Sequence, residues 1–313
     1  MCILGLSVNQ RDDIPFVCIH NRDEDLSRPT VPPCPSQQTD LIYGFDKKYT
    51  SSTWMGLHRQ KGLFACVNNF RSKHPMPSKE LRGSRGVLVQ RFLQDPSFCQ
   101  SLKRNTQTPT DLEGHFPGFS IVHGDLSQGQ TAKVFLTSNR PHPQLFASDP
   151  DSNSKALTAQ IPKGAHAMSN GSFDDVSWPK VLFLKTEVSR IVENFPKLDT
   201  EDAKKEADQV MRLKEIANQK VFIAHDCGKA LPPLQESGTR SQTIVVRTRS
   251  REYFFFRSTD EYPKIGDWIW TQDELKKEGA SLALFQNVGG MLPAAAVAAV
   301  SVLALGVLLA RRR

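Results

Sequence analysis

The sequence begins MCILGLSV (residues 1–8), continues through NQRDD (9–13) and IPFVCI (14–19), and reaches HNRDE (20–24). Two short apolar runs flank a polar corner, and this pattern predicts a β-hairpin. Because antiparallel strands pair in register, the outer ends of a hairpin lie side by side. We therefore expect Cys2 to lie close to the polar cluster formed by Asn21, Arg22, Asp23 and Glu24.

A cysteine at position 2 suits one chemistry in particular. A small residue after Met1 favours removal of that methionine, which leaves Cys2 with both a thiol and a free α-amino group. The unperturbed pKa is about 7.7–8.0 for the amine and about 8.5 for the thiol, so the amine can serve as the base for the thiol. The charge of Arg22 is expected to lower the thiol pKa further. The pattern predicts an N-terminal-nucleophile site; the alternative is a small buried strand residue beside a solvated polar turn.

The composition limits the class of protein. With 313 residues, of which 39% are hydrophobic and 23% charged, the chain can bury a sizeable core in one large domain or two small ones. The net charge is +7, but Arg311, Arg312 and Arg313 supply three of these charges, so we expect no nucleic-acid surface. The six cysteines lack CxxC spacing, which favours reduced thiols and predicts neither a disulfide framework nor a metal site: Cys2, Cys18, Cys34, Cys66, Cys99 and Cys227.

The rest of the chain carries both strand and helix signals. Asn68 and Asn69 end a strand-like run, where asparagine serves as a turn former or as a neutral oxyanion donor. We expect strands at 51–57, 63–70, 118–123, 131–136, 164–168, 244–247 and 253–256, helices at 84–93, 174–194 and 200–219, and loop-rich connections at 28–38, 99–115, 138–163 and 225–238.

Residues 291–310 contain no charged side chain. A helix of this length spans roughly 30 Å, the thickness of the hydrocarbon core of a bilayer. The segment predicts a transmembrane tail anchor, with a buried core helix as the alternative. Because no signal peptide is visible, the domain is expected in the cytosol, on the mitochondrial outer membrane or on the endoplasmic reticulum or Golgi. The predicted organisation is a folded domain at 1–275, a linker at 276–290 and the anchor at 291–310.

Several motifs together resemble the NRDE family, also called the transport and Golgi organisation protein 2 family. They keep the order of the family and cover roughly residues 1–260, so the anchor lies outside the resemblance. The motifs are Met1-Cys2, Asn21-Arg22-Asp23-Glu24, Thr53-Trp54-Met55-Gly56-Leu57, Asn69, Ser84-Arg85-Gly86, Gly118-Phe119, Ser169-Asn170, Trp178-Pro179-Lys180 and Gly238-Thr239-Arg240.

The family is in turn similar to cysteine N-terminal-nucleophile hydrolases, the group of penicillin V and bile-salt acylases. This similarity implies an α+β fold, a four-layer αββα sandwich, to which the tail adds a C-terminal transmembrane helix. It also implies catalytic roles: Cys2 as nucleophile, Asn69 and Asn170 as oxyanion or amine-positioning donors, and Arg240 as a residue that steadies the site. The acylases space their Arg and Asp three residues apart. Both Arg22 to Asp25 and Asn21 to Glu24 have this spacing, so the cluster Asn21, Arg22, Asp23 and Glu24 leaves the amine-holding carboxylate open.

The resemblance implies roles in Golgi organisation and protein secretion, and in the handling of haem, lipids or acyl-CoA. Two classes of function follow. One is a hydrolase that cleaves the amide or thioester bond of a small acyl substrate and requires no cofactor. The other is a non-catalytic carrier or chaperone that uses the same pocket for acyl-CoA or for haem as a transported ligand.

Overall fold

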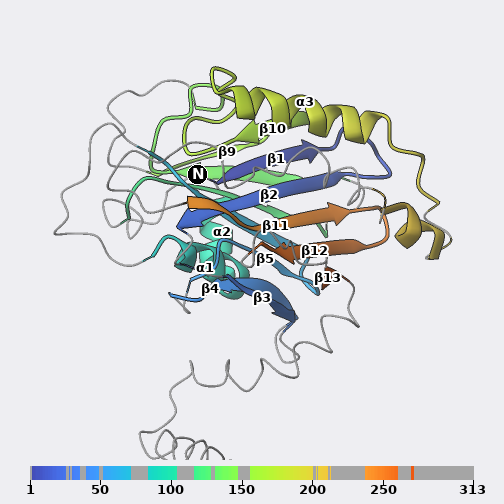
Figure 1. The fold of residues 1–313 in the computed structure, drawn as a ribbon, viewed down its shortest axis with the longest axis horizontal. Helices are drawn as coiled ribbons and strands as arrows, with labels where there is room; N and C mark the ends of the chain where they lie inside the picture. The colour runs from blue at the N-terminus through green and yellow to red at the C-terminus, as the bar shows by residue number, and fades with distance from the viewer. Residues whose placement is uncertain are drawn as a thin grey trace, which may run out of the picture.

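The chain folds into two antiparallel β-sheets covered by a few helices, an α+β architecture (Figure 1). This computed structural model describes residues 2–25, 28, 30–35, 40–48, 52–71, 84–103, 116–127, 131–146, 156–199, 202, 204–210, 212, 237–259 and 269–270. The two sheets lie face to face, with an apolar cluster between them.

The first sheet has the strand order β10-β1-β2-β11-β12-β13 and the second the order β3-β4-β5-β6-β7-β8-β9. The strands of the first sheet are β1 (Ile3–Val8), β2 (Phe16–Asp25), β10 (Gly164–Met168), β11 (Ser237–Arg247), β12 (Glu252–Ser258) and β13 (Ile269–Trp270). Those of the second are β3 (Thr30–Pro35), β4 (Leu41–Asp46), β5 (Met55–His58), β6 (Leu63–Asn69), β7 (Phe119–Asp125), β8 (Lys133–Ser138) and β9 (Leu157–Gln160). The labelled helices are α1 (Gly86–Gln94), α2 (Pro96–Lys103) and α3 (Pro179–Glu193), and residues 204–210 are also helical.

The predicted N-terminal hairpin is confirmed. β1 and β2 pair antiparallel, with Ile3 opposite Asn21 and Val8 opposite Phe16. β2 continues through the polar cluster to Asp25, whereas the apolar pattern predicted a strand that ends at about residue 19. Pairing with β11 on its other side, from Phe16 to Asp25, extends this strand beyond its apolar part.

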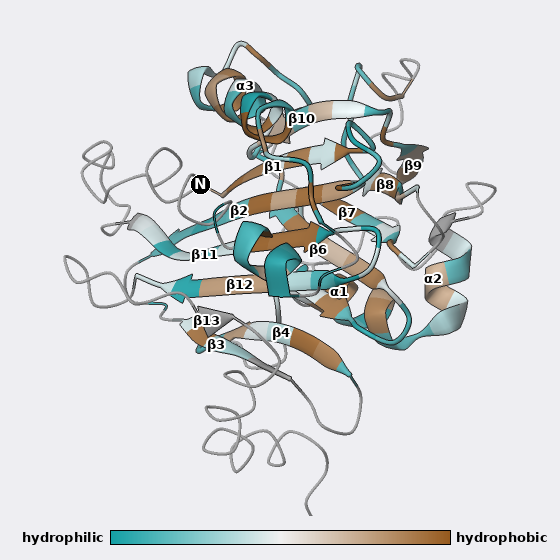
Figure 2. Cartoon of the chain, turned by 90° about the vertical axis from the view of Figure 1, so that its right-hand side faces the viewer, coloured by the Kyte–Doolittle hydropathy of each residue, from teal (hydrophilic) through white to brown (hydrophobic). Residues whose placement is uncertain are grey.

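Apolar side chains separate the layers. Between the sheets, the rings of Phe16 and Phe64 approach to 5.1 Å between centroids. α3 packs on the outer face of the first sheet, and α1 with α2 packs on the outer face of the second. Figure 2 shows hydrophobic strand segments in both sheets and a mixed surface on α3. The order of the layers is therefore helix, sheet, sheet, helix, each pair of layers joined by its own apolar cluster.

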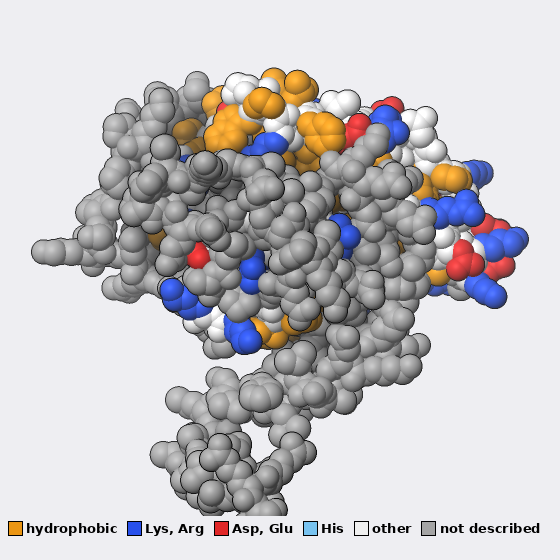
Figure 3. Space-filling model, viewed as in Figure 1, with side chains coloured by type: hydrophobic (Ala, Val, Ile, Leu, Met, Phe, Trp, Pro, Cys, Tyr) orange, Lys and Arg blue, Asp and Glu red, His pale blue; other side chains and the backbone are white. Residues whose placement is uncertain are grey.

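α3 is amphipathic, and a glycine lets it approach the first sheet closely. A Cβ added to Gly5 would lie 2.8 Å from Leu184, so no larger residue fits beneath the helix without a shift. Leu182 and Phe183 of α3, and Val176 just before it, are exposed hydrophobic residues. Figure 3 shows hydrophobic side chains on the surface along the top of the molecule, where α3 lies.

Three predicted loops contain regular structure. Residues 30–35 form the edge strand β3, residues 157–160 form β9, and residues 96–103 form α2. The prolines of β3 obscured its pattern, but an edge strand tolerates prolines because one of its sides needs no ladder hydrogen bonds. The register of β3 with β4 shifts between Val31 and Cys34, where two of these prolines stand.

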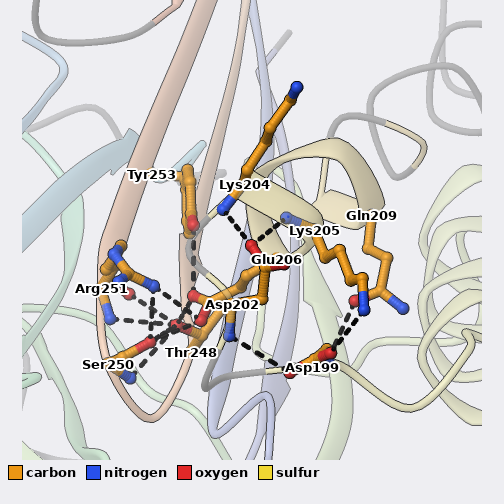
Figure 4. A network of polar contacts seen from close by, with 10 residues as sticks. All are labelled: Asp199, Asp202, Lys204, Lys205, Glu206, Gln209, Thr248, Ser250, Arg251 and Tyr253. Carbon is orange, nitrogen blue, oxygen red and sulfur yellow. Dashed lines mark hydrogen bonds and ion pairs between the residues drawn. The ribbon is translucent and has the colours of Figure 1, made fainter.

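Part of the helix predicted at 200–219 is described, and residues 204–210 are helical. Its buried Glu206 accepts hydrogen bonds from four residues at the β11–β12 turn (Figure 4): Thr248, Ser250, Arg251 and Tyr253. Burial, followed by the charge of Glu206, raises the pKa of Tyr253 to about 12. A single buried carboxylate thus anchors this helix to the first sheet.

The predicted anchor at 291–310 lies outside the described residues, as does most of the predicted 225–238 loop. Within the described ranges, no helix is long and apolar enough to cross a membrane.

Candidate functional site

Cys2 lies at the start of β1, between two neighbouring strands. Leu4 pairs with His20 of β2 and with Met168 of β10, so continuing these registers places Cys2 opposite Arg22 and Asn170. The thiol lies 3.6 Å from the carbonyl oxygen of Asp23, to which it donates. Ser169 Oγ donates to the carbonyl of Cys2 at 2.8 Å. The expected proximity of Cys2 to the polar cluster is confirmed for Asp23.

The Cys2 thiol is buried, with 9% of the residue exposed. Burial raises its pKa, and the charge of Asp23 acts in the same direction. The positive amino terminus and Arg22 act in the opposite direction but do not outweigh burial. Arg22 thus acts on the thiol pKa in the predicted direction, but burial outweighs it, so near neutral pH the thiol is protonated and a base is needed to ionise it.

Asp23 is the carboxylate of the cluster that interacts with the amino terminus. Its Oδ1 accepts a hydrogen bond from Thr239 Oγ1 at 2.7 Å. Burial raises the pKa of Asp23, while the positive amino terminus, Thr239 and Lys180 act to lower it. Glu24 instead forms an ion pair with Arg28 at 2.9 Å. Of the carboxylates left open by the sequence, Asp23 is the one whose backbone carbonyl contacts the Cys2 thiol and whose pKa the positive amino terminus acts to lower.

Arg22 joins the two sheets. Its Nη2 lies 2.7 Å from Asp46 Oδ2 on β4, and only 4% of the Arg22 side chain is exposed. The guanidinium also lies over the Trp54 ring, 5.0 Å from its centroid. Arg28 contributes a second cation to the same Asp46 oxygen at 2.5 Å. Arg22 is thus committed to a buried inter-sheet ion pair, and its charge is largely compensated there.

Asn21 belongs to a lateral chain of polar contacts. Its Oδ1 accepts from Gln242 Nε2 at 2.9 Å, and Gln242 Oε1 accepts from Arg257 Nε at 2.6 Å. Burial lowers the pKa of Arg257 to about 10. This chain of contacts ties β2 to β11 and β12.

Asn69 and Asn170 come together at the Cys2 end of the two sheets. Asn170 Nδ2 donates to the carbonyl of Asn69 at 2.6 Å, and Arg71 N donates to the carbonyl of Asn170 at 2.8 Å. The buried Oδ1 of Asn170 has no hydrogen-bond partner among the described residues. It is an acceptor placed beside the residue that would carry the free amine.

Arg240 occupies an irregularity in β11. Thr239 pairs with Asp23 and Ser241 with Arg22, so Arg240 is the extra residue of a bulge next to the site. Its carbonyl accepts from Thr259 N at 3.0 Å. A bulge re-aims a side chain at the end of a strand, and this one brings Thr239 onto Asp23.

Sequence reasoning did not assign roles to three further residues near Cys2. They are Thr239, which holds Asp23, and the cations Arg85 and Lys180, whose charges interact with Cys2. Arg85 directly precedes α1, and Lys180 lies in the first turn of α3. The motifs that contain them were recognised in the sequence, but the sequence did not indicate that their charges interact with Cys2. Among the residues that the structure describes, no group of three or more His, Cys, Asp or Glu could hold a metal ion.

Comparison with known proteins adds a family to this geometry. An uncharacterized protein of Saccharomyces cerevisiae is 26% identical over 210 residues, which are 61% of this chain and 62% of the yeast protein. The match thus covers less than two thirds of the length of that relative. The family model described as Transport and Golgi organisation 2 matches residues 1–260. Because the family model covers well over half of the residues of this chain, the chain belongs to the transport and Golgi organisation 2 family, the NRDE family.

Proposed function

We propose that this member of the family is a hydrolase of acyl amides or thioesters, with Cys2 as an N-terminal nucleophile. The observation that carries the proposal is the placement of Cys2 at the start of β1, beside Asp23 and Asn170. The order of layers, helix on sheet on sheet on helix, also supports kinship with the cysteine N-terminal-nucleophile hydrolases. The family name points to transport and Golgi organisation as the cellular setting.

The proposed reaction uses the α-amino group of Cys2 as the base. The amine takes the thiol proton while the sulfur bonds to the acyl carbon and the carbonyl electrons move onto oxygen. The tetrahedral intermediate then breaks its bond to the leaving amine or thiol, which takes the proton from the ammonium. Water, deprotonated by the same amine, attacks the S-acyl intermediate, releases the acid and restores the thiol. The raised thiol pKa makes this base necessary.

The neighbouring residues have distinct proposed roles. The buried Asn170 Oδ1 accepts a hydrogen bond from the terminal amine, and Asp23 balances the charge of the ammonium. Asn170 Nδ2 keeps a second hydrogen beyond the one given to Asn69, so this amide can also serve the developing oxyanion. Arg240 keeps the β11 bulge in place, and Arg22 holds the two sheets at this end.

A carrier that binds acyl-CoA or haem without turnover is the second candidate. The specific observation in its favour is the raised pKa of the buried Cys2 thiol, because a neutral thiol is a poor nucleophile. A carrier needs no free amine, whereas the hydrolase does. A blocked amino terminus would therefore exclude the hydrolase and leave the carrier.

We predict that the mature protein begins at Cys2 with an unmodified amine. Intact-mass measurement of protein purified from its native cells, followed by sequencing of the terminal peptide, checks this. The same sample is then assayed on a panel of acyl amides and thioesters and titrated with haem. Retained Met1 or an acetylated Cys2 contradicts the hydrolase, since the base would be absent. Haem binding without turnover by a chain with a free Cys2 favours the carrier.

We further propose that residues 291–310 anchor the protein by its tail, with the domain at 1–275 and a linker at 276–290. Support comes from the uncharged run followed by three arginines, which can settle at the far interface.

We predict that the protein stays in the membrane fraction after alkaline carbonate extraction and that added protease digests the domain in intact organelles. Release by carbonate, or protection from protease, contradicts this topology. Co-fractionation then separates mitochondria from endoplasmic reticulum and Golgi.

A further inference from the structure

We propose that Asn68, held in place by His20, donates a hydrogen bond to the oxyanion that forms when Cys2 attacks the substrate carbonyl. The inference rests on the proposed function, because it adds a catalytic residue to the same reaction. It departs from the resemblance, which implies this role for the neighbouring Asn69. The two asparagines are adjacent at the end of β6, so their side chains leave the strand on opposite faces.

The end of β6 lies against the strand row that holds the nucleophile. The carbonyl of Asn69 accepts a hydrogen bond from Asn170 Nδ2 at 2.6 Å. Asn170 stands opposite Cys2 when the register of β1 with β10 is continued. This contact between the sheets brings the part of β6 that carries Asn68 close to the row of Cys2.

Alternation along β6 turns the side chain of Asn68, and not that of Asn69, toward the first sheet. Cys66 belongs to the apolar cluster between the sheets, whereas Val67 belongs to the cluster beneath α1 and α2. Successive side chains of a strand point to opposite faces. Asn68 therefore continues the inner face of Cys66, and Asn69 continues the outer face of Val67.

Cys2 and His20 lie on the facing side of the first sheet. Leu4, two residues after Cys2, lies in the cluster between the sheets, whereas Ile3 lies in the cluster beneath α3. Leu4 pairs with His20, and paired residues share a face, so Cys2, Leu4 and His20 all face inward. Cys2 and His20 are diagonal neighbours on paired strands, a relation that corresponds to about 7–8 Å.

His20 joins Asn68 across the space between the sheets. Its Nε2 lies 3.2 Å from Asn68 Oδ1, and the two residues are 0% and 1% exposed. Because an amide oxygen only accepts, Nε2 carries the proton of this hydrogen bond. The bond fixes the orientation of the Asn68 amide and leaves both hydrogens of Nδ2 for another acceptor.

The amide nitrogen of Asn68 is buried and has no hydrogen-bond partner in the part of the chain that the structure describes. A buried donor without an acceptor is costly, so its retention beside a nucleophile points to an acceptor that appears during the reaction. A donor that is already fixed in a water-excluded site stabilises a developing oxyanion without reorganisation. Together with Asn170 Nδ2, it gives the oxyanion one donor from each sheet.

Steady-state kinetics of the full-length protein on its best acyl amide or thioester test this role. Asn68→Ala should lower kcat by about 10²-fold with little change in KM, because the hydrogen bond forms only in the transition state. Asn68→Asp keeps the shape of the side chain and an acceptor for His20, and it should lose at least as much. Asn69→Ala should lose less, since its carbonyl remains for Asn170. Asn194→Ala, at the exposed end of α3, should keep the wild-type rate.

His20 is a positioning residue that acts through Asn68. His20→Phe should lower kcat, and His20→Gln should restore part of the loss, because a glutamine amide can also donate to Asn68 Oδ1. In a protein that already carries Asn68→Ala, His20→Phe should lower kcat no further. Additive losses would show that His20 does not act through this amide.

An acyl aldehyde separates the oxyanion donor from the hydrolase. The Cys2 sulfur bonds to the aldehyde carbon, the carbonyl electron pair moves onto oxygen, and the thiol proton passes to the α-amine. Binding of this compound needs no turnover, and Asn68→Ala should weaken it by about the same factor as kcat/KM. The matching alcohol cannot react with Cys2, so its affinity should not change. If the wild type binds the aldehyde in this Asn68-dependent way without hydrolysing any substrate, the donor stands and only the hydrolase fails.

Three results overturn the assignment. Wild-type kcat and aldehyde affinity in Asn68→Ala, or a larger loss in Asn69→Ala, would exclude Asn68 as the donor and leave the hydrolase intact. Equal losses of affinity for the aldehyde and for the alcohol would show that Asn68 shapes the pocket alone. A wild-type protein that neither hydrolyses a substrate nor binds the aldehyde at Cys2 overturns both proposals.

Discussion

Replacement of Cys2 by serine is expected to lower the rate of acyl hydrolysis by about 10²-fold or more, equivalent to roughly 3 kcal/mol of activation free energy. Serine keeps the shape of the nucleophile but ionises far less readily than a thiol. The wild-type rate should rise as pH rises from neutral, because burial raises the pKa of the thiol and more thiolate forms at higher pH. Steady-state kinetics on the best acyl amide or thioester, from pH 6 to pH 9, measure both effects.

Cys99→Ser is the matched control for this experiment. Cys99 is also buried, but it lies on α2 in the cluster between the helices and the second sheet. The control should keep the wild-type rate and its pH dependence. Unchanged hydrolysis in Cys2→Ser would sink the nucleophile assignment, and retained binding of acyl-CoA or haem by the same variant would favour the carrier.

Replacement of Asp46 by alanine is expected to destabilise the folded state by about 3–5 kcal/mol, the usual cost of removing one partner from a buried ion pair. Asp46 Oδ2 accepts from both Arg22 and Arg28, and 6% of its side chain is exposed. Without it, Arg22 keeps the Trp54 ring and, among the described residues, hydrogen bonds at 3.3 Å to Thr30 Oγ1 and the carbonyl of Arg28. Denaturant unfolding of the purified full-length protein, followed by tryptophan fluorescence, measures the change.

An exposed ion pair and a double variant complete the test. Lys205→Ala removes a lysine that is 67% exposed and lies 3.4 Å from Asp199, so it should cost at most about 1 kcal/mol. The double variant Arg22→Met/Asp46→Ala should lose less free energy of unfolding than the sum of the two single variants, because no unpaired charge remains on β2. Additive losses, or an Asp46→Ala cost as small as that of Lys205→Ala, would show that the inter-sheet pair does not stabilise the fold.

Short-range patterns in the sequence predicted much of the scaffold. The two short apolar runs before and after the polar corner at 9–13 were enough for the first hairpin, and that hairpin placed Cys2 beside Asp23. Apolar spacing and Pro179 were enough for α3. These features depend on neighbours along the chain, since a strand or helix expresses its period within a few residues. The strand β3 escaped prediction because its prolines are tolerated only through its position at a sheet edge.

What the cluster residues do was decided only by the tertiary structure. Asn21, Arg22, Asp23 and Glu24 look equivalent in sequence, yet alternate side chains of one strand leave on opposite faces and meet different elements. Arg22 forms an ion pair with Asp46 on the other sheet. Asn21 accepts a hydrogen bond from Gln242, and Asp23 accepts one from Thr239. Arg85 and Lys180, whose charges interact with Cys2, likewise come from the starts of two helices that cover opposite sides of the sandwich. The sequence by itself determined which residues can carry the chemistry; the packing of two sheets decided which of them meet, because such contacts join residues far apart in the chain.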